Sequence, residues 1–327
     1  MHEPLLTPMK WHLHKMARRG WRAICSKLYQ DRNTDPSHSI IIAGTARSGT
    51  TWLADLIASQ MPARIMFEPF HSELVPGFRE FNYFRYMRPG LENQALLAFV
   101  RRVLTGQIRN SWIDRQVETL RPQWRVIKEI RACLFLRWMH DRFPEVPMVF
   151  IIRHPCAVVA SRIRLNWNPN NDIEPFLVQQ HLLDDFLGDH LPAIRKASTD
   201  AEKHAIIWCV SNLVPLWQFR DAPLHVMFYE NLCQHPEAEI PNLFRAIGRP
   251  YTDTVFKYAR RPSTTTRMQS AVVKGIDPTA SWRRELSGDA IKRVLGIVKE
   301  FGLAHLYGDA DLPQQKTANF REMTHGR

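Results

Sequence analysis

The residues that follow the first short apolar run of the chain could bind an anion. Ser39–Ala43 leads into the sequence GTARSGTT at residues 44–51, after which a helical pattern begins. A strand, a glycine-containing turn and a helix start bring backbone N–H groups and the positive end of the helix dipole around one point. We therefore predict a phosphate-binding loop at residues 44–51.

This loop has the glycine spacing of a nucleotide-binding P-loop but lacks its lysine. Gly44 and Gly49 fit the G-x-x-x-x-G spacing, whereas Thr50 stands where that motif requires Lys. The run Met148–Arg153 ends in Arg and not in an acid, so the Mg²⁺ ligand of a P-loop NTPase is missing there. Arg47 instead supplies a positive charge, which suits a transferring group stabilised by the protein's own cations and amides. A kinase-like phosphotransferase stays an alternative that these departures disfavour.

A second anion pocket is predicted about a hundred residues further along the chain. Arg153 ends an apolar run and can offer two parallel hydrogen bonds to a phosphate. Pro155 then opens a helical pattern on which Ser161 supplies a hydroxyl donor. Two pockets, one after each of two strands, match a ligand with phosphates at its 5′ and 3′ positions better than a triphosphate chain.

A parallel sheet is needed to position these loops. Short apolar runs alternate with longer helical patterns, which predicts an α/β fold: a P-loop-like parallel sheet flanked by helices on both faces. The predicted strands are Ser39–Ala43, Arg64–Phe67, Arg125–Ile130, Met148–Arg153 and His225–Tyr229. The predicted helices are Thr50–Gln60, Leu91–Thr105, Ala132–Phe143, Pro155–Leu165, Glu202–Arg220 and Ser287–Phe301. Ligands of such sheets bind where the strands end, so the residues after each strand are the site candidates.

Composition supports a cytoplasmic globular protein with an anionic partner. The 327 residues include 44 Lys and Arg against 32 Asp and Glu, and the net charge of +12 predicts an anionic partner. Of all residues, 45% are hydrophobic, and this composition excludes disordered and collagen-like proteins. No apolar run approaches the roughly 20 residues of a membrane span, and no secretory signal precedes the first strand. The five cysteines form no C-x-x-C pair, so we expect reduced thiols and neither a disulfide framework nor a zinc site.

Three regions can be separated along the chain. We predict a basic amphipathic helix within residues 1–38, a globular domain at residues 39–308 and a frayed polar tail at residues 309–327. The helix carries six Lys and Arg with no acid between Glu3 and Asp31. Its apolar residues recur at helical spacing: Trp21, Ile24, Cys25 and Leu28. The pattern favours a helix docked on the domain with a solvated basic face over one bound to a membrane surface.

Both phosphate motifs together resemble those of the sulfotransferases that use 3′-phosphoadenosine 5′-phosphosulfate (PAPS). Residues 45–53 (TARSGTTWL) resemble the 5′-phosphosulfate loop of that family, and residues 150–161 (FIIRHPCAVVAS) resemble its 3′-phosphate site. Carbohydrate and tyrosylprotein sulfotransferases are the most similar in motifs, and the resemblance extends in order over about residues 39–301. The cofactor-binding residues that it implies are Arg47, Ser48, Gly49, Thr50, Thr51, Trp52, Arg153, Ser161, Tyr229, Lys274 and Gly275.

Some of these assignments rest on further parts of the resemblance. Trp52 resembles the tryptophan that stacks on adenine, and Tyr229 begins a Y-E-x-L sequence whose tyrosine lies near adenine. Lys274 and Gly275 resemble part of the segment that closes over the cofactor, although Val273 replaces its arginine.

The resemblance also implies a set of catalytic residues: Glu68, Lys128, Arg47 and His71. Glu68 lies in a Phe-Glu-Pro sequence after the second strand and would be the base, with His71 as the competing base. Desolvation by neighbouring phenylalanines could raise the pKa of Glu68. Lys128 resembles the lysine near the leaving phosphosulfate bridge, and an ion pair with Glu129 or Glu68 is the alternative.

The activity that follows from the resemblance is sulfuryl transfer from PAPS to an acceptor hydroxyl, with release of 3′-phosphoadenosine 5′-phosphate (PAP) and no metal. The Phe-Glu-Pro sequence favours a carbohydrate acceptor, and a small-molecule alcohol or phenol is the alternative. A nucleic-acid-binding protein is a further alternative that the net charge motivates. Golgi relatives have an N-terminal anchor that is not found here, so a soluble, bacterial-type member is expected, with peripheral membrane contact through its basic helix as an option. The oligomeric state stays open.

Overall fold

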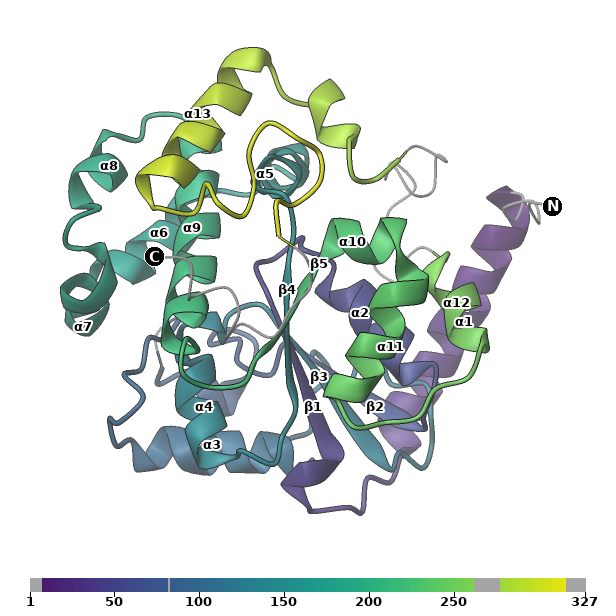
Figure 1. The fold of residues 1–327 in the computed structure, drawn as a ribbon. Helices are drawn as coiled ribbons and strands as arrows, with labels where there is room; N and C mark the ends of the chain where they lie inside the picture. The colour runs from purple at the N-terminus through teal and green to yellow at the C-terminus, as the bar shows by residue number, and fades with distance from the viewer. Residues whose placement is uncertain (1–7, 82, 262–276, 316–327) are drawn as a thin grey trace.

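The computed structural model describes residues 8–81, 83–261 and 277–315, with the backbone alone for residues 8–15. Its centre is a five-stranded parallel sheet in the order β2-β3-β1-β4-β5 (Figure 1). The strands are β1 (Ser39–Ala43), β2 (Ala63–Phe67), β3 (Trp124–Glu129), β4 (Met148–Ile152) and β5 (His225–Phe228). All five predicted strands are therefore confirmed, each within one residue of its predicted bounds.

Helices pack on both faces of this sheet, as the α/β pattern predicts. Alternate residues of each strand point to opposite faces, so Ile41 and Ala43 join one apolar core and Ile40 and Ile42 join the other. The longer described helices are α1 (Pro8–Leu28), α2 (Thr50–Ala58), α3 (Gln94–Leu104), α5 (Pro155–Arg164), α9 (Asp200–Gln218), α11 (Pro236–Ala246) and α13 (Gly288–Glu300). The first core includes α3, α5, α9 and α13, and the second includes α2 and α11 (Figure 1).

Several shorter helices complete the two layers. They are α4 (Leu136–Arg142), α6 (Asn170–Leu177), α7 (Gln180–Leu182), α8 (Leu191–Lys196), α10 (Tyr229–Gln234) and α12 (Thr254–Ala259). The sequence pattern predicts only α4 among these six, and it extends that helix over residues 132–143, whereas Cys133–Phe135 form a separate 3₁₀ turn. The others are eight residues or fewer, too short for a clear apolar period, and α6 contains Pro175, a residue unfavourable inside a helix.

The order of the strands defines where a ligand would bind. From β1 the chain passes first to β2 and β3 on one side and then to β4 and β5 on the other side. Such a reversal between neighbouring strands leaves a crevice beyond their carboxyl ends, the usual ligand position in this class of sheet. The loops after β1 and β4 meet at that point.

Two buried arginines lie side by side in the neighbouring strands at the other end of the sheet. Arg64 and Arg125 are register partners in β2 and β3, and both side chains are wholly buried. Asp31 lies between them, 3.0 Å from Arg125 and 3.4 Å from Arg64, and Asp114 accepts from Arg64 Nε at 2.9 Å. These two carboxylates compensate charges that would otherwise be unpaired in a buried environment.

Helix α1 docks on the domain with a face that differs from the predicted one. Cys25 is buried, whereas Trp21, Ile24 and Leu28 of the same apolar pattern are exposed. Helix α1 therefore packs on the domain, as predicted. The face that it turns to solvent is apolar, whereas the prediction has a basic face there. Among the described residues, no helix combines the length and the apolar content needed to cross a bilayer.

The first residues of the predicted tail are held to the domain. Arg283 Nε donates to Asp311 at 2.6 Å, and the backbone N–H of Gln314 donates to the carbonyl of Leu306 at 2.9 Å. The frayed tail that the sequence predicts from residue 309 is therefore wrong for residues 309–315.

Candidate active site

The loop between β1 and α2 passes so close to its neighbours that its two terminal positions require glycine. A Cβ atom at Gly44 would collide with the carbonyl oxygen of Ile151, and one at Gly49 would lie 2.6 Å from the ring of Tyr229. Gly49 also has a φ of +99°, which disfavours any residue with a Cβ. No described side chain caps the start of α2 at Thr50, so its first N–H groups point toward the loop without a side-chain acceptor.

The two predicted phosphate motifs come together at this point. Arg47 Nε donates to Ser161 Oγ at 3.0 Å, although the two residues are 114 positions apart in the chain. Arg153 NH1 donates to the carbonyl of Arg47 at 3.2 Å, and its other terminal nitrogen donates to the carbonyl of Pro278 at 2.9 Å. The loop after β1 and the loop after β4 therefore form one cationic site.

Aromatic rings line the same site. The Arg153 guanidinium lies over the ring of Tyr229, 4.3 Å from its centroid, and Trp52 meets that ring edge-on with centroids 5.4 Å apart. Tyr229 is buried and Trp52 is half-buried. Trp52 and Arg153 thus both contact Tyr229, whose ring lies against Gly49.

A buried acid that sequence reasoning missed holds the turn after β4. Glu230 accepts from the backbone N–H of His154 at 3.0 Å and from the hydroxyl of Tyr307 at 2.7 Å. Burial raises the pKa of Glu230, and hydrogen bonds from Tyr307 and His154 oppose that shift. Its position next to Tyr229 was the only sequence signal for it. Glu230 orients the backbone directly after Arg153.

A second charged cluster lies where β2 and β3 end. Glu68 follows β2 and is 4% exposed, and its carboxylate accepts from Lys128 Nζ on one oxygen and from Arg131 NH1 at 2.5 Å on the other. Of the alternatives for Lys128, the ion pair with Glu68 is thus confirmed. Arg131 was not predicted, although it lies just three residues beyond Lys128.

The two cations determine the ionisation of Glu68. Burial by itself would raise the pKa of this carboxyl, but the charges of Lys128 and Arg131 outweigh burial and lower the pKa to about 2. The expected rise of the pKa through desolvation is therefore wrong. Glu68 is a carboxylate at neutral pH, the state in which a carboxyl group can accept a proton.

Comparison with known protein families assigns the chain to one family. The profile of the sulfotransferase family matches residues 39–253, more than half of the 327 residues. The chain belongs to the sulfotransferase family. We therefore set aside the kinase and nucleic-acid-binding alternatives.

Individual relatives are distant from this sulfotransferase. The nodulation protein NoeE of Sinorhizobium fredii (strain NBRC 101917 / NGR234) is 22% identical over 274 residues, which make up 79% of this chain and 62% of that protein. The chain thus spans less than two thirds of the length of this relative.

Solved structures that resemble the sulfotransferase include the mouse sulfotransferase SULT7A1 complexed with PAP, at 13% identity and a TM-score of 0.41, covering 87% of this chain and 90% of that chain. Another is the sulfotransferase domain of the Synechococcus PCC 7002 olefin synthase, at 16% identity and a TM-score of 0.42, covering 83% of this chain and 98% of that domain.

The competing base of the sulfotransferase lies in an aromatic setting. His71 is 7% exposed, and its ring meets Trp112 and Tyr83 edge-on at 5.3 Å and 5.8 Å between centroids. Burial is the main cause that lowers the pKa of His71, and the charge of Arg131 also lowers it, to a value of about 4. His71 is therefore neutral at pH 7, so both base candidates are in a proton-accepting state and their protonation does not separate them.

A second buried carboxyl lies near the charged cluster, and from the sequence it is predicted only as an alternative partner of Lys128. Glu129 is the last residue of β3 and the register partner of Ala43, directly before the phosphate loop. One of its oxygens accepts from the backbone N–H of Ile130 at 3.2 Å, and the other has no partner among the described residues. Burial and the negative charge of Glu68 raise the pKa of Glu129 to about 7. This residue can change its charge at neutral pH, whereas Glu68 does not.

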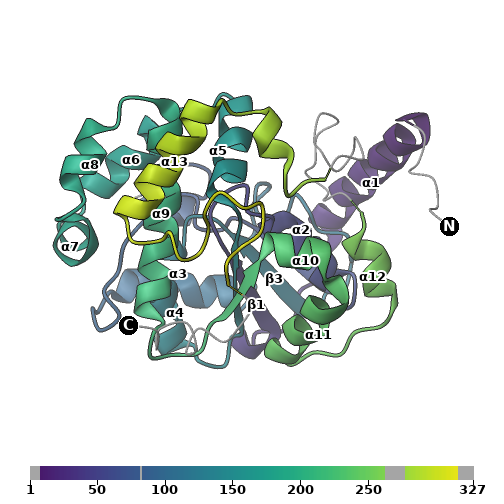
Figure 2. The same cartoon turned by 45° about the horizontal axis from the view of Figure 1, so that its top comes forward.

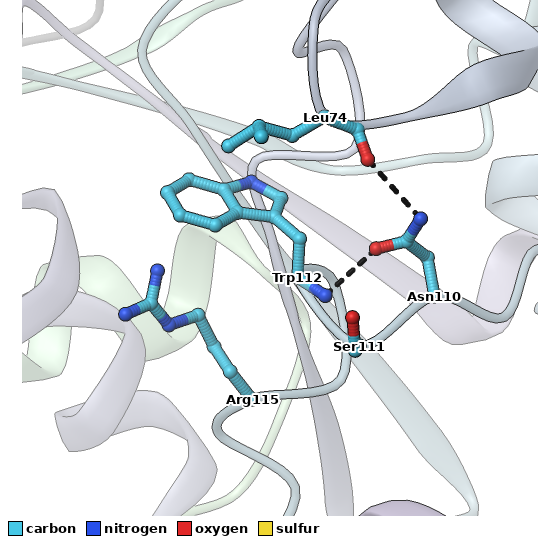
Figure 3. Close-up of a pocket in the computed structure, with 5 residues that line it drawn as sticks. All are labelled: Leu74, Asn110, Ser111, Trp112 and Arg115. Atoms are coloured by element: carbon cyan, nitrogen blue, oxygen red, sulfur yellow. Dashed lines mark hydrogen bonds between the residues drawn. The ribbon is translucent and has the colours of Figure 1, made fainter.

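Figure 3 shows the lining of an open pocket of about 440 Å³ at Trp112. Its lining residues are Leu74, Asn110, Ser111, Trp112 and Arg115. The Trp112 ring contacts the rings of Phe67 and His71, with centroids 5.2 Å and 5.3 Å apart. The guanidinium of Arg115 lies 4.4 Å from the centroid of the Trp112 ring. The pocket therefore adjoins the residues on either side of Glu68 in the chain.

Two predicted cofactor residues of the sulfotransferase, Lys274 and Gly275, lie outside the described residues. The other predicted residues form two groups. The first group lies in the loop after β1 or next to it: Arg47, Ser48, Gly49, Thr50, Thr51, Trp52, Arg153, Ser161 and Tyr229. The second group lies after β2 and at the end of β3: Glu68, His71 and Lys128. Both groups are at the carboxyl ends of the parallel strands.

Proposed function

We propose that this enzyme transfers the sulfuryl group of PAPS to a hydroxyl of a carbohydrate and releases PAP. The observation that carries the proposal is the meeting of Arg47, Ser161 and Arg153 at the crevice of the sheet. Cations from two separate loops there suit a ligand that has two separate phosphate groups.

The residues at this site fit such a cofactor. Ser48 Oγ is buried and Arg153 Nε is likewise enclosed, and neither atom has a hydrogen-bond partner in the described part of the chain. Buried polar groups normally have a partner, so these atoms are suited to receive one from a ligand. In the proposal the 5′ side is held by Arg47, Ser48, Gly49, Thr50 and Thr51, the 3′-phosphate by Arg153 and Ser161, and the adenine by Trp52 and Tyr229. Lys274 and Gly275 belong to the proposed site by resemblance alone.

The charged cluster would carry the proton transfer. PAPS supplies the activated sulfuryl group. Glu68, ionised and fixed by two cations, would take the proton of the acceptor hydroxyl on a carboxylate oxygen, and His71 is the alternative base. Lys128 and Arg47 would stabilise negative charge as it develops on the leaving side. In this proposal the cations are all supplied by the protein and no metal takes part.

The pocket at Trp112 is the proposed entry for the acceptor. A half-buried aromatic ring flanked by amide and guanidinium groups suits a sugar, which has an apolar face and a hydroxyl-rich edge. The Phe-Glu-Pro sequence after β2 supports the same class of acceptor. A phenol or other small alcohol is the alternative, and it would not need the polar rim of Asn110 and Arg115.

We also propose that the enzyme works in the cytoplasm. All five cysteines are free, and four of them are buried. Unpaired thiols are typical of a reducing compartment.

Calorimetric titration tests the proposed cofactor. PAP should bind without metal, and Arg153→Ala should weaken this binding at least tenfold because a charge-assisted contact to phosphate is lost. Arg164→Ala is the matched control: Arg164 lies on the same helix as Ser161 but pairs with Glu285 at the surface. Binding of ATP with Mg²⁺ in preference to PAP, or an equal effect of both variants, would contradict the proposal.

A further inference from the structure

The outward face of α1 is apolar and largely exposed, and Trp21 at its edge donates through Nε1 to the carbonyl of Glu118 at 2.9 Å. Four large hydrophobic side chains on this helix are exposed: Met16 (71%), Trp21 (45%), Ile24 (49%) and Leu28 (63%). At 100° per residue they lie within one broad stripe along the helix. In both ribbon views the amino-terminal part of α1 projects from the body of the molecule (Figures 1 and 2).

The opposite face already holds α1 to the domain. Arg18 and Arg22 pair with Glu118, the latter at 2.6 Å, and Cys25 and Tyr29 form a small buried cluster with Val117. A rotation of the helix that covered its apolar stripe would expose this cluster and break both ion pairs. The exposed stripe is therefore a consequence of how α1 is anchored.

The charges of α1 indicate what could cover the stripe. The helix sequence has six Lys and Arg and no acidic residue. Arg18 and Arg22 are engaged with Glu118, whereas Arg19 and Lys27 are exposed. A second copy of the chain that presented the same face would bring like charges together, whereas an anionic surface would be attracted.

We propose that the outward face of α1 binds the surface of a bilayer that contains anionic lipids. The helix would lie in the interfacial plane, with Trp21, Ile24 and Leu28 in the boundary of the acyl chains and with Arg19 and Lys27 at the headgroups. Apolar residues on one face with basic residues beside them are the features by which interfacial helices bind such surfaces. This inference does not depend on the proposed donor or acceptor.

Co-sedimentation of the full chain with vesicles tests the inference. The protein should bind vesicles of phosphatidylcholine and phosphatidylserine at 3:1 and bind pure phosphatidylcholine vesicles at least tenfold more weakly. The double variant Ile24→Glu with Leu28→Glu alters two exposed residues of the stripe and should bind the anionic vesicles at least tenfold more weakly than the unchanged protein. Arg19→Glu should weaken binding about fivefold, and more at low than at high salt.

A matched control separates this face from exposed apolar residues in general. Trp217→Glu alters a tryptophan on α9 that is 54% exposed, and it should leave vesicle binding unchanged. Circular dichroism and thermal unfolding show whether each variant is folded. Absence of binding to anionic vesicles, or equal binding by the double variant, would overturn the inference. A dimer in sedimentation equilibrium that the double variant abolishes would overturn it too, because a second copy would then cover the stripe.

Discussion

Replacing Glu68 with Gln should change the stability of the protein in a way that depends on pH. The Glu68 carboxyl has its pKa lowered from 4.5 to about 2, since the charges of Lys128 and Arg131 outweigh burial. A carboxyl with a lower pKa in the folded state stabilises the fold above its unfolded pKa, and this contribution is lost as pH falls toward the folded value. The contribution is therefore complete above about pH 5 and is absent near pH 2.

The expected magnitude follows from the two pKa values. A fall from 4.5 to about 2 corresponds to about 3 kcal/mol of unfolding free energy, at roughly 1.4 kcal/mol for each tenfold change in proton affinity. Between pH 5.5 and pH 3.0, about 2 kcal/mol of this should disappear. The Gln side chain does not titrate, so the difference in stability between wild type and Glu68→Gln should shrink by that amount.

Urea denaturation of both proteins at the two pH values is the assay. Subtracting the variant from the wild type cancels the titration of carboxyl groups far from residue 68. Glu129 lies close enough to respond, so the same pair is also compared in a Glu129→Gln background. Glu285→Gln is the surface control, because it removes an exposed ion pair with Arg164 that should contribute less than about 1 kcal/mol. A stability difference for Glu68→Gln that is equal at pH 5.5 and pH 3.0 would refute the assigned ion pairs.

Three other substitutions test separate parts of the structure. Asp31→Asn removes a carboxylate shared by two buried guanidinium groups, so urea denaturation should show an unfolding free energy lower by about 3–5 kcal/mol. The control Asp221→Asn removes an exposed ion pair and should lower the unfolding free energy by less than about 1 kcal/mol. Gly49→Ala forces a side chain into a φ of +99° and should weaken PAP binding in calorimetry at least tenfold, whereas Gly90→Ala, which meets open space, should not. Trp112→Ala should raise the KM for a glycan acceptor about tenfold and leave the PAP Kd unchanged, and an unchanged KM would exclude the pocket from acceptor binding.

Much of the fold could be predicted because its signals are local. A run such as Ser39–Ala43 is apolar on both faces, which is what a parallel strand covered by helices requires. The loop after it could be predicted as well, since Gly44 and Gly49 meet backbone and ring contacts that no side chain could tolerate. The short helices between residues 170 and 196 could not be predicted, because their stability comes from packing and not from a long apolar period.

The electrostatics of the candidate site could not be predicted from the sequence. The pKa of Glu68 depends on whether burial or the neighbouring cations dominate, and the sequence alone predicts the wrong sign. Arg131 and Glu129 reach the cluster only because β2 and β3 are adjacent and in register, with Phe67 opposite Lys128. Neither residue has a spacing in the chain that would single it out.

The sequence by itself determined the parallel sheet, the glycine-containing loop after β1 and the basic character of α1, because each depends on residues close together in the chain. Only the tertiary structure decided that Arg47 meets Ser161, that Glu68 is held as a carboxylate, and that α1 keeps its apolar stripe outside. These properties arise from charge and burial between segments that are far apart in the chain. Coulombic and desolvation energies depend on distances in space, and those distances exist only once the sheet has formed.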